Sequence, residues 1–247
     1  MSVGLAIVGA SAAGLAAAVS AARAGADVVL LETKEEVGVP PAPASVGFDF
    51  LWPDAVPRPP RSVRRRLDGV KVRARDGRVP IVESPLSLFD RTALDAHLAA
   101  EAQKAGARIV TGAAAGAWEV LEARVVLFAD GARSEARRHM RPTREPSQMA
   151  WGAILECEAP GDGGRLLLTL GSHAPGGRSQ LNPHGEGRWS HWTFFRGDPA
   201  HAERLARRAL ALDARLQGWG DVTARFVGVA PDPVYTLPRQ PLRMRGI

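Results

Sequence analysis

Apolar and small residues follow one another at the start of the chain in an order that predicts a strand, a helix and a second strand. The apolar run at residues 5–8 leads into the small-residue segment at residues 9–14. Apolar residues then recur with the spacing of one helix face, at Leu15, Ala18, Val19 and Ala22. A second apolar run ends at Glu32. This order predicts a βαβ unit.

Prolines interrupt the pattern after Glu32, so residues 33–66 are expected to form a loop. Residues 70–75 and 79–82 are expected to pair as a hairpin through a two-residue turn at Asp76-Gly77. A second helix is expected between an N-cap at Asp90 and a C-terminal glycine at Gly106. Its apolar face consists of Leu94, Leu98 and Ala102.

Three further strands are expected before the chain changes character, at residues 107–111, 118–120 and 125–128. The last runs into Asp130-Gly131 and a short helix that bears Arg137 and Arg138. Beyond residue 149, alternating polar and apolar positions predict an antiparallel sheet covered by an amphipathic helix over residues 200–216. The alternating stretches lie at residues 149–158, 165–170 and 188–195.

The glycine-rich turn has the features of a dinucleotide-binding site. Gly9 permits a tight turn, the small Ser11 lets a pyrophosphate approach the backbone, and Gly14 lets helix and strand pack closely. The amides at Ala12 and Ala13 then lie at the positive end of the helix dipole, where they suit phosphate.

Glu32 follows the glycines by about 20 residues, where a carboxylate accepts hydrogen bonds from a ribose diol. Thr33 is expected beside it. Because a 2′-phosphate would meet like charge, the site favours FAD or NAD over NADP.

Two other interpretations explain less of this segment. A buried helix without a ligand accounts for the apolar face, but not for the small loop residues and the acid. A hydrolase nucleophile elbow needs glycine two residues after the serine, and position 13 is Ala13.

The composition fits a soluble α/β protein of 247 residues, 45% of them hydrophobic. No apolar run approaches the ~20 residues that span a bilayer, and the N-terminus lacks signal-peptide features, so we expect a cytoplasmic protein. Cys157 is the only cysteine and is expected in the core. No Cys/His cluster has metal-ligand spacing, so no metal is expected.

The formal net charge of +6 raises the question of an anionic partner. Basic residues cluster in one segment, at Arg58, Arg61, Arg64, Arg65, Arg66, Lys71, Arg73, Arg75 and Arg78. A solvated loop or edge explains them, and so does docking to an anionic membrane or an acidic partner. Nucleic acid is not expected.

With these motifs placed, the chain resembles FAD-dependent oxidoreductases of the aromatic-hydroxylase type, and among them the geranylgeranyl reductase family. The likeness lies in residues 9–14 with Glu32, in residues 90–95 with residues 105–107, and in residues 129–134 with Arg137. It implies that Glu32 binds the adenosine ribose and that Arg91 lies near the FAD phosphates or ribityl chain. It also implies that Asp130 and Gly131 lie beside the pyrophosphate.

The sequence departs from this family in three places. Residues 37–47 contain no cysteine, whereas the family has one near the flavin ring. The family's aromatic stretch in the substrate sheet is replaced by residues 175–183, which include Arg178, Gln180 and Asn182. A small or polar substrate therefore fits better than a long prenyl chain. The family's Gly-Asp segment, expected after residues 236–241, is absent before Ile247.

These observations predict an α/β protein with a Rossmann-like, glutathione-reductase-type FAD-binding domain interleaved with an antiparallel-sheet substrate domain, truncated at the C-terminus. The expected FAD-binding domain comprises residues 1–50 and 80–145, and the substrate domain residues 51–79 and 146–247.

The expected function is transfer of a hydride through bound FAD to an unidentified small-molecule substrate. The sequence identifies no catalytic acid or base: three histidines, His173, His184 and His191, lie in the substrate sheet, where surface or core roles are more common. Two alternatives are a non-catalytic remnant and half of a split flavoprotein, completed by a partner chain or a second copy. An NAD-dependent dehydrogenase is disfavoured by the Asp-Gly segment.

Overall fold

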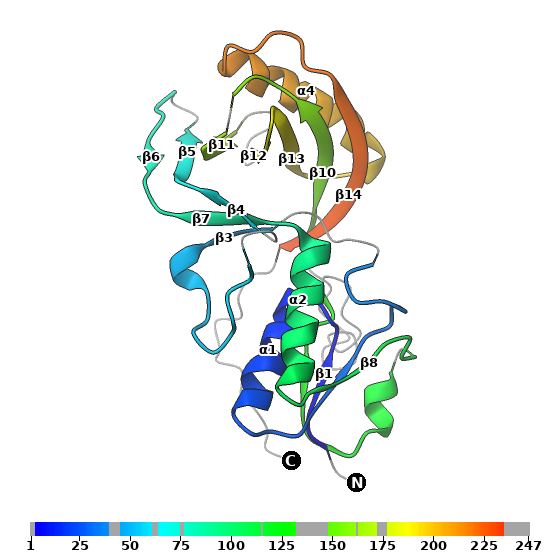
Figure 1. Ribbon diagram of the computed structural model, residues 1–247. Helices are drawn as coiled ribbons and strands as arrows, with labels where there is room; N and C mark the ends of the chain where they lie inside the picture. Colours follow the sequence, from blue (N-terminus) through cyan, green and yellow to red (C-terminus); the bar gives the residue numbers. More distant parts are fainter. Residues whose placement is uncertain are drawn as a thin grey trace.

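Three β-sheets and three α-helices form the part of the chain that the computed structural model describes (Figure 1). The described residues are 3–39, 45–60, 64–74, 77–114, 116–131, 148–161, 163–171 and 177–234. The predicted helix with Arg137 and Arg138, and His173, lie outside these ranges.

A parallel sheet of four strands forms one end of the molecule, in the order β8-β2-β1-β9. Its strands are β1 (Val3–Val8), β2 (Val28–Leu31), β8 (Arg108–Val110) and β9 (Ala123–Phe128). Helices α1 (Ala12–Arg23) and α2 (Arg91–Lys104) share one apolar core with Ile7 and Leu30 of the sheet. The βαβ unit and the second helix are therefore confirmed, and the Asp90 side chain caps the Ala93 amide at 3.0 Å.

The predicted strand at residues 118–120 is wrong. This segment is a 3₁₀ helix, η3 (Ala117–Val120), which follows Gly116 in a left-handed conformation. The Trp118 ring packs edge-on against Phe128 with 5.0 Å between ring centroids. Trp118 thus covers the face of the sheet opposite α1 and α2, in a cluster with Val29 and Leu31.

A seven-stranded sheet forms the other end, in the order β14-β10-β13-β12-β11-β5-β6. Its neighbours pair antiparallel except β11 with β5. The strands are β5 (Gly69–Arg73), β6 (Ile81–Val82), β10 (Gln148–Glu158), β11 (Arg165–Leu170), β12 (Arg178–Gly185), β13 (Arg188–Arg196) and β14 (Ala224–Val234). Helix α4 (Ala202–Leu216), preceded by η5 (Pro199–His201), covers one face (Figure 1).

The predicted hairpin is present, although Asp76 of its predicted turn lies outside the described residues. Strands β5 and β6 pair, and the Ala74 amide donates to the Arg78 carbonyl at 2.8 Å. This bond leaves three residues between the paired positions, ending at Gly77 with φ +82°. The left-handed conformation of Gly77 is one that favours glycine.

A polar network anchors α4 to the seven-stranded sheet. Asp213 accepts hydrogen bonds from Thr169 (2.8 Å), Ser179 (2.6 Å) and His191 Nε2 (2.9 Å). All four side chains are buried. His191 is therefore a core residue with satisfied hydrogen bonds, and Cys157 is buried in the same layer as expected.

A three-stranded sheet lies between the two larger ones (Figure 1). It comprises β3 (Ser45–Phe48), β7 (Leu86–Phe89) and β4 (Arg64–Leu67), with the 3₁₀ helix η1 (Asp49–Leu51) after β3. Part of the expected loop at residues 33–66 is thus strand. Leu67, Leu86 and Leu88 of this sheet pack against Val70 and Leu166 of the seven-stranded sheet.

Candidate nucleotide-binding site

The turn between β1 and α1 requires glycine at its first position. Gly9 has φ +101°, and a Cβ there would lie 2.6 Å from the carbonyl oxygen of Ala129. Its amide donates to the Leu31 carbonyl at 2.8 Å. Gly9 therefore brings the turn into contact with the end of β9 while it remains bonded to the end of β2.

Gly14 allows α1 to approach this turn. A Cβ on Gly14 would lie 2.0 Å from the Gly9 carbonyl oxygen and 3.2 Å from Ala129 Cβ. Any side chain would push the first turn of the helix away from β1. Both glycines thus hold the start of α1 against the carboxyl ends of β1 and β9, as the sequence motif requires.

The first amides of α1 lack side-chain caps. An α-helix leaves these donors without intrahelical acceptors, and the N-cap Ser11 makes no side-chain capping bond. Instead, Ser11 Oγ donates to the Ala129 carbonyl at 3.3 Å. The first turn carries no acidic residue, Ala12 is half-buried and Ala13 is exposed. This helix start therefore presents accessible donors and the positive end of the dipole to an anion.

Glu32 lies directly after β2 and next to the glycine turn. One carboxylate oxygen accepts from the Ala10 amide at 2.7 Å, and the other from the Lys34 amide at 3.0 Å and from Thr33 Oγ1 at 3.3 Å. These bonds fix the carboxylate beside the start of α1. Because a carboxylate offers about four acceptor positions, it retains capacity for a further donor.

Asp130 and Gly131 follow β9 at the same edge of the sheet. A Cβ on Gly9 would lie 2.9 Å from Asp130 Cα, so the two motifs are in van der Waals contact although 121 positions separate them (130 − 9). Gly131 is exposed with φ +77°. The structure thus brings together the glycine turn, Glu32 with Thr33, and the Asp-Gly segment.

Arg91 begins α2 and is held by Asp95, one turn along the same helix. Its Nη2 lies 3.1 Å from Asp95 Oδ2, and the two side chains are 13% and 4% exposed. Burial raises the pKa of Asp95, whereas hydrogen bonding and charge from Arg91 oppose the rise. The sequence analysis missed Asp95, although the spacing of four residues between a basic and an acidic residue is the signal of a helical ion pair.

The N-terminal ends of α1 and α2 lie at the same end of the parallel sheet (Figure 1). For α1 this follows from its connection, because it joins the parallel strands β1 and β2 and runs antiparallel to both. Arg91 therefore lies at the edge that carries Gly9 and Glu32, and Glu32 and Lys34 are among the charges that act on Asp95.

A second set of polar side chains lies on the face of the seven-stranded sheet opposite α4. Gln180 donates to Asn182 at 2.5 Å, Asn182 to Ser190 at 3.3 Å, and Ser190 hydrogen-bonds His184 at 2.9 Å. Burial and the charge of Arg188 lower the pKa of His184.

Aromatic side chains continue this face beside the polar set. Trp192 is half-buried and stands opposite Gln180, whereas Phe194 stands opposite Arg178, whose guanidinium lies 4.2 Å from the ring centroid. Among the described residues, the Trp192 indole N–H is a buried donor without a partner.

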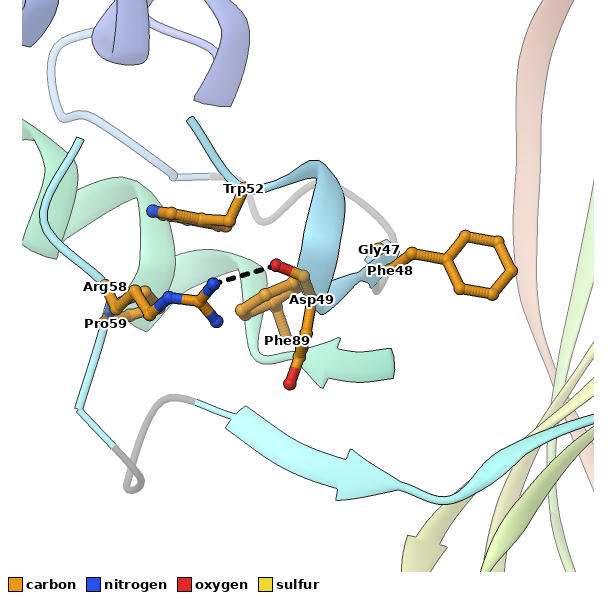
Figure 2. A pocket seen from close by; sticks show the side chains of 7 residues that line it. All are labelled: Gly47, Phe48, Asp49, Trp52, Arg58, Pro59 and Phe89. Atoms are coloured by element: carbon orange, nitrogen blue, oxygen red, sulfur yellow. Dashed lines mark hydrogen bonds between the residues drawn. The ribbon is translucent and has the colours of Figure 1, made fainter. Parts of the chain in front are cut away.

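Two cavities in the described part of the chain lie apart from the glycine turn. One, about 20 Å³, has room for a single water and is lined by Trp52, Phe89 and Arg58, which donates to the Asp49 carbonyl at 2.9 Å (Figure 2). The other is an open groove of about 630 Å³ beside the end of α4, lined in part by Arg215 and Trp219.

Comparison with known proteins agrees with this geometry. Residues 4–137, more than half of the chain, match the family described as FAD dependent oxidoreductase. The chain belongs to the FAD-dependent oxidoreductases. The predicted cofactor, FAD, is therefore confirmed as that of the family. Within the described ranges, no helix has the length and apolarity needed to cross a bilayer.

Related sequences include digeranylgeranylglycerophospholipid reductases. The digeranylgeranylglycerophospholipid reductase 1 of Methanothermobacter thermautotrophicus is 29% identical over 210 residues, which cover 73% of this chain and 53% of that protein. The protein of the same name from Methanosphaera stadtmanae is 36% identical over 111 residues, covering 42% of this chain and 27% of that protein. The match thus spans about half of the first relative and about a quarter of the second.

Solved structures share the fold. A geranylgeranyl bacteriochlorophyll reductase-like protein from Thermoplasma acidophilum superposes with a TM-score of 0.76 at 19% identity, over 94% of this chain and 66% of its own. The halogenase PltM, in complex with FAD, gives a TM-score of 0.63 at 13% identity, over 94% of this chain and 60% of its own. The predicted α/β fold with a Rossmann-like FAD-binding domain is confirmed, and the expected similarity to geranylgeranyl reductases is found.

Proposed function

We propose that this FAD-dependent oxidoreductase holds the ADP half of FAD at the start of α1 and transfers a hydride through the flavin to a small polar substrate. The observation that carries the proposal is the meeting of Gly9, Glu32 and Asp130 at one sheet edge. When bound, the flavin supplies the capacity to accept and donate a hydride. The chain's own residues bind and orient the cofactor and the substrate.

The roles follow from the contacts of each residue. The amides of Ser11, Ala12, Ala13 and Gly14 hold the diphosphate, since helix amides at a dipole's positive end favour anions. Glu32 accepts from the adenosine ribose hydroxyls, and Thr33 helps to orient its carboxylate. The carboxylate would repel the 2′-phosphate of NADP, which supports selection of FAD.

Asp130 and Gly131 flank the pyrophosphate in this proposal. Gly131 is exposed, and a Cβ there would meet nothing within 4 Å, which supports an open approach to the backbone. Arg91 lies at the same edge and supplies positive charge toward the phosphates or ribityl chain.

A small polar substrate is supported by the face of the seven-stranded sheet away from α4. Gln180, Asn182 and Ser190 form a hydrogen-bonded row there, and His184 ends it. Because the pKa of His184 is lowered, its ring is neutral near pH 7 and can accept or donate a hydrogen bond. The relatives are named for a digeranylgeranylglycerophospholipid, whose apolar chains would not match this row.

The division into two domains is part of the same proposal. Strands β1, β2, β8 and β9 lie within the expected cofactor domain, at residues 1–50 and 80–145, and β10 to β14 within the substrate domain, at residues 51–79 and 146–247. Among the described strands, two pairings cross this division, β6 with β5 and β7 with β4. A cytoplasmic location and an anionic membrane partner stay predictions.

A second candidate is a flavoprotein completed by a further polypeptide segment. Its support is β9, an edge strand whose Val125 and Leu127 are 56% and 41% exposed although they continue an apolar row of the sheet. A strand added along this edge would cover both side chains.

The absorption spectrum of the purified chain with FAD tests the proposal. We expect flavin bands that comigrate with the protein in gel filtration and bleach with a reductant. Glu32→Ala should weaken FAD binding about 10- to 100-fold, since hydrogen bonds to a charged group contribute about 1.5–3 kcal/mol. Glu36→Ala, at an exposed acid nearby, is the matched control and should bind as the wild type does. Binding only after a second polypeptide is added would favour the second candidate.

A further inference from the structure

Asp95 is a buried carboxylate that none of the roles above uses. It lies on α2, and its side chain is 4% exposed. Acidic side chains are rarely buried this deeply unless they are paired, because burial removes the hydration of the charge. Its partner is Arg91, at the start of the same helix and at the sheet edge that carries the nucleotide-binding residues.

The contact between the two side chains engages one edge of the guanidinium. Arg91 Nε lies 3.4 Å from Asp95 Oδ1, and Nη2 lies 3.3 Å from Oδ1 and 3.1 Å from Oδ2. A planar guanidinium held by both carboxylate oxygens is fixed in direction as well as in position. Asp95 therefore restrains the direction of the Arg91 side chain.

The loop after β2 packs over this pair. Gly38 has φ +79°, a left-handed conformation that favours glycine, and a Cβ there would lie 3.3 Å from Asp95 Cβ, so the loop is in close contact with Asp95. Lys34 and Glu32, at the start of the same loop, are among the charges that shift the pKa of Asp95. Asp95 thus lies between α2 and the segment that carries the proposed ribose ligand.

We propose that Asp95 is a positioning residue that pre-orients Arg91 toward the diphosphate of FAD, a role that rests on the proposed function. An arginine side chain loses rotamer entropy when it binds a ligand, and a side chain already held by a neighbour loses less. The pair also keeps the buried carboxylate neutralised when no cofactor is bound. Asp95 acts through Arg91 and does not itself contact the cofactor.

A double-mutant cycle tests whether Asp95 acts on FAD binding through Arg91, and urea unfolding of the same variants reports any loss of stability. FAD affinity is measured by quenching of flavin fluorescence in the wild type, Asp95→Asn, Arg91→Ala and the double variant. We expect Asp95→Asn to raise the dissociation constant about tenfold when Arg91 is present and less than twofold when it is absent. An Asp95→Asn variant that changes the affinity equally in both backgrounds acts without Arg91, and that result would overturn the proposal.

A matched control variant and a replacement for Asp95→Asn complete the experiment. Glu101→Gln removes another acid of α2, one that pairs with Arg23 at 3.2 Å, and should leave FAD affinity unchanged. Should Asp95→Asn fail to fold, as urea unfolding will show, Asp95→Ser enters the same cycle. A wild type that binds no FAD overturns the proposed function and this role with it. A wild type that binds FAD, with Asp95→Asn within twofold of it, overturns the positioning role alone.

Discussion

Gly14→Ala should destabilise the protein, although the same change in most helices stabilises it. In an ordinary helix interior, alanine is favoured over glycine by about 1 kcal/mol. At Gly14, however, the added Cβ would lie 2.0 Å from the Gly9 carbonyl oxygen, where ordinary contact begins at 3.4 Å. The methyl group must therefore move α1 and the turn apart by more than 1 Å.

The size of the effect follows from these two opposing contributions. Overpacking costs about 1–3 kcal/mol and more where backbone must move, so we take about 4 kcal/mol for a contact between Cβ and a backbone carbonyl. The helical preference for alanine over glycine offsets about 1 kcal/mol of this cost. The net loss is about 3 kcal/mol of unfolding free energy, a large part of the stability of a typical domain.

Urea unfolding, followed by far-ultraviolet circular dichroism, measures this loss. Gly220→Ala is the matched control, because a Cβ at Gly220 meets nothing within 4 Å and its φ is ordinary. We expect the control to be as stable as the wild type or slightly more stable. A Gly14→Ala variant as stable as the control would refute the close approach of helix and turn.

Three further predictions concern the substrate-sheet half. Asp213→Ala leaves three buried donors without their acceptor and should lower the free energy of unfolding in urea by about 3–5 kcal/mol. Glu203→Ala, on the exposed side of α4, should change it by less than about 0.5 kcal/mol. Equal effects of the two substitutions would contradict the network. Burial raises the pKa of the Cys157 thiol to about 11, so little of the reactive thiolate is present at about pH 8. Iodoacetamide at that pH should therefore label Cys157 only after unfolding. Labelling of the folded chain would count against its burial. The pKa of His184 is lowered from 6.5, so just below that pH the unfolded chain binds more protons than the folded chain, and stability should fall as the pH drops. The urea midpoints measured at about pH 7 and about pH 5 should therefore differ less in His184→Gln than in the wild type. The same difference between the two midpoints in both proteins would contradict the shift.

The nucleotide-binding turn was predictable from sequence because its requirements are local and steric. Gly9 and Gly14 are the positions where a Cβ would collide with backbone, and Glu32 follows at the distance that a strand, a helix and a strand dictate. The approach of Asp130 to the glycine turn was implied by the family resemblance, which places Asp130 and Gly131 beside the pyrophosphate.

Other elements depend on contacts that no local pattern reveals. Strand β4 contains three consecutive arginines and was expected to be loop, yet it pairs with β7. Trp118 has high strand propensity, but its packing on Phe128 stabilises a 3₁₀ turn. The i,i+4 spacing of Arg91 and Asp95 was visible, whereas the burial that makes Asp95 unusual comes from the loop at Gly38.

Competition between the two halves of the cofactor tests the central claim most directly. FAD bound to the full chain is titrated with ADP and, separately, with FMN, and flavin fluorescence and calorimetry report displacement. Because the proposed site would hold the diphosphate at the start of α1 and the adenosine ribose at Glu32, ADP should displace FAD while FMN at the same concentration does not. Displacement by FMN, or FAD binding that ADP leaves unchanged, would contradict the account.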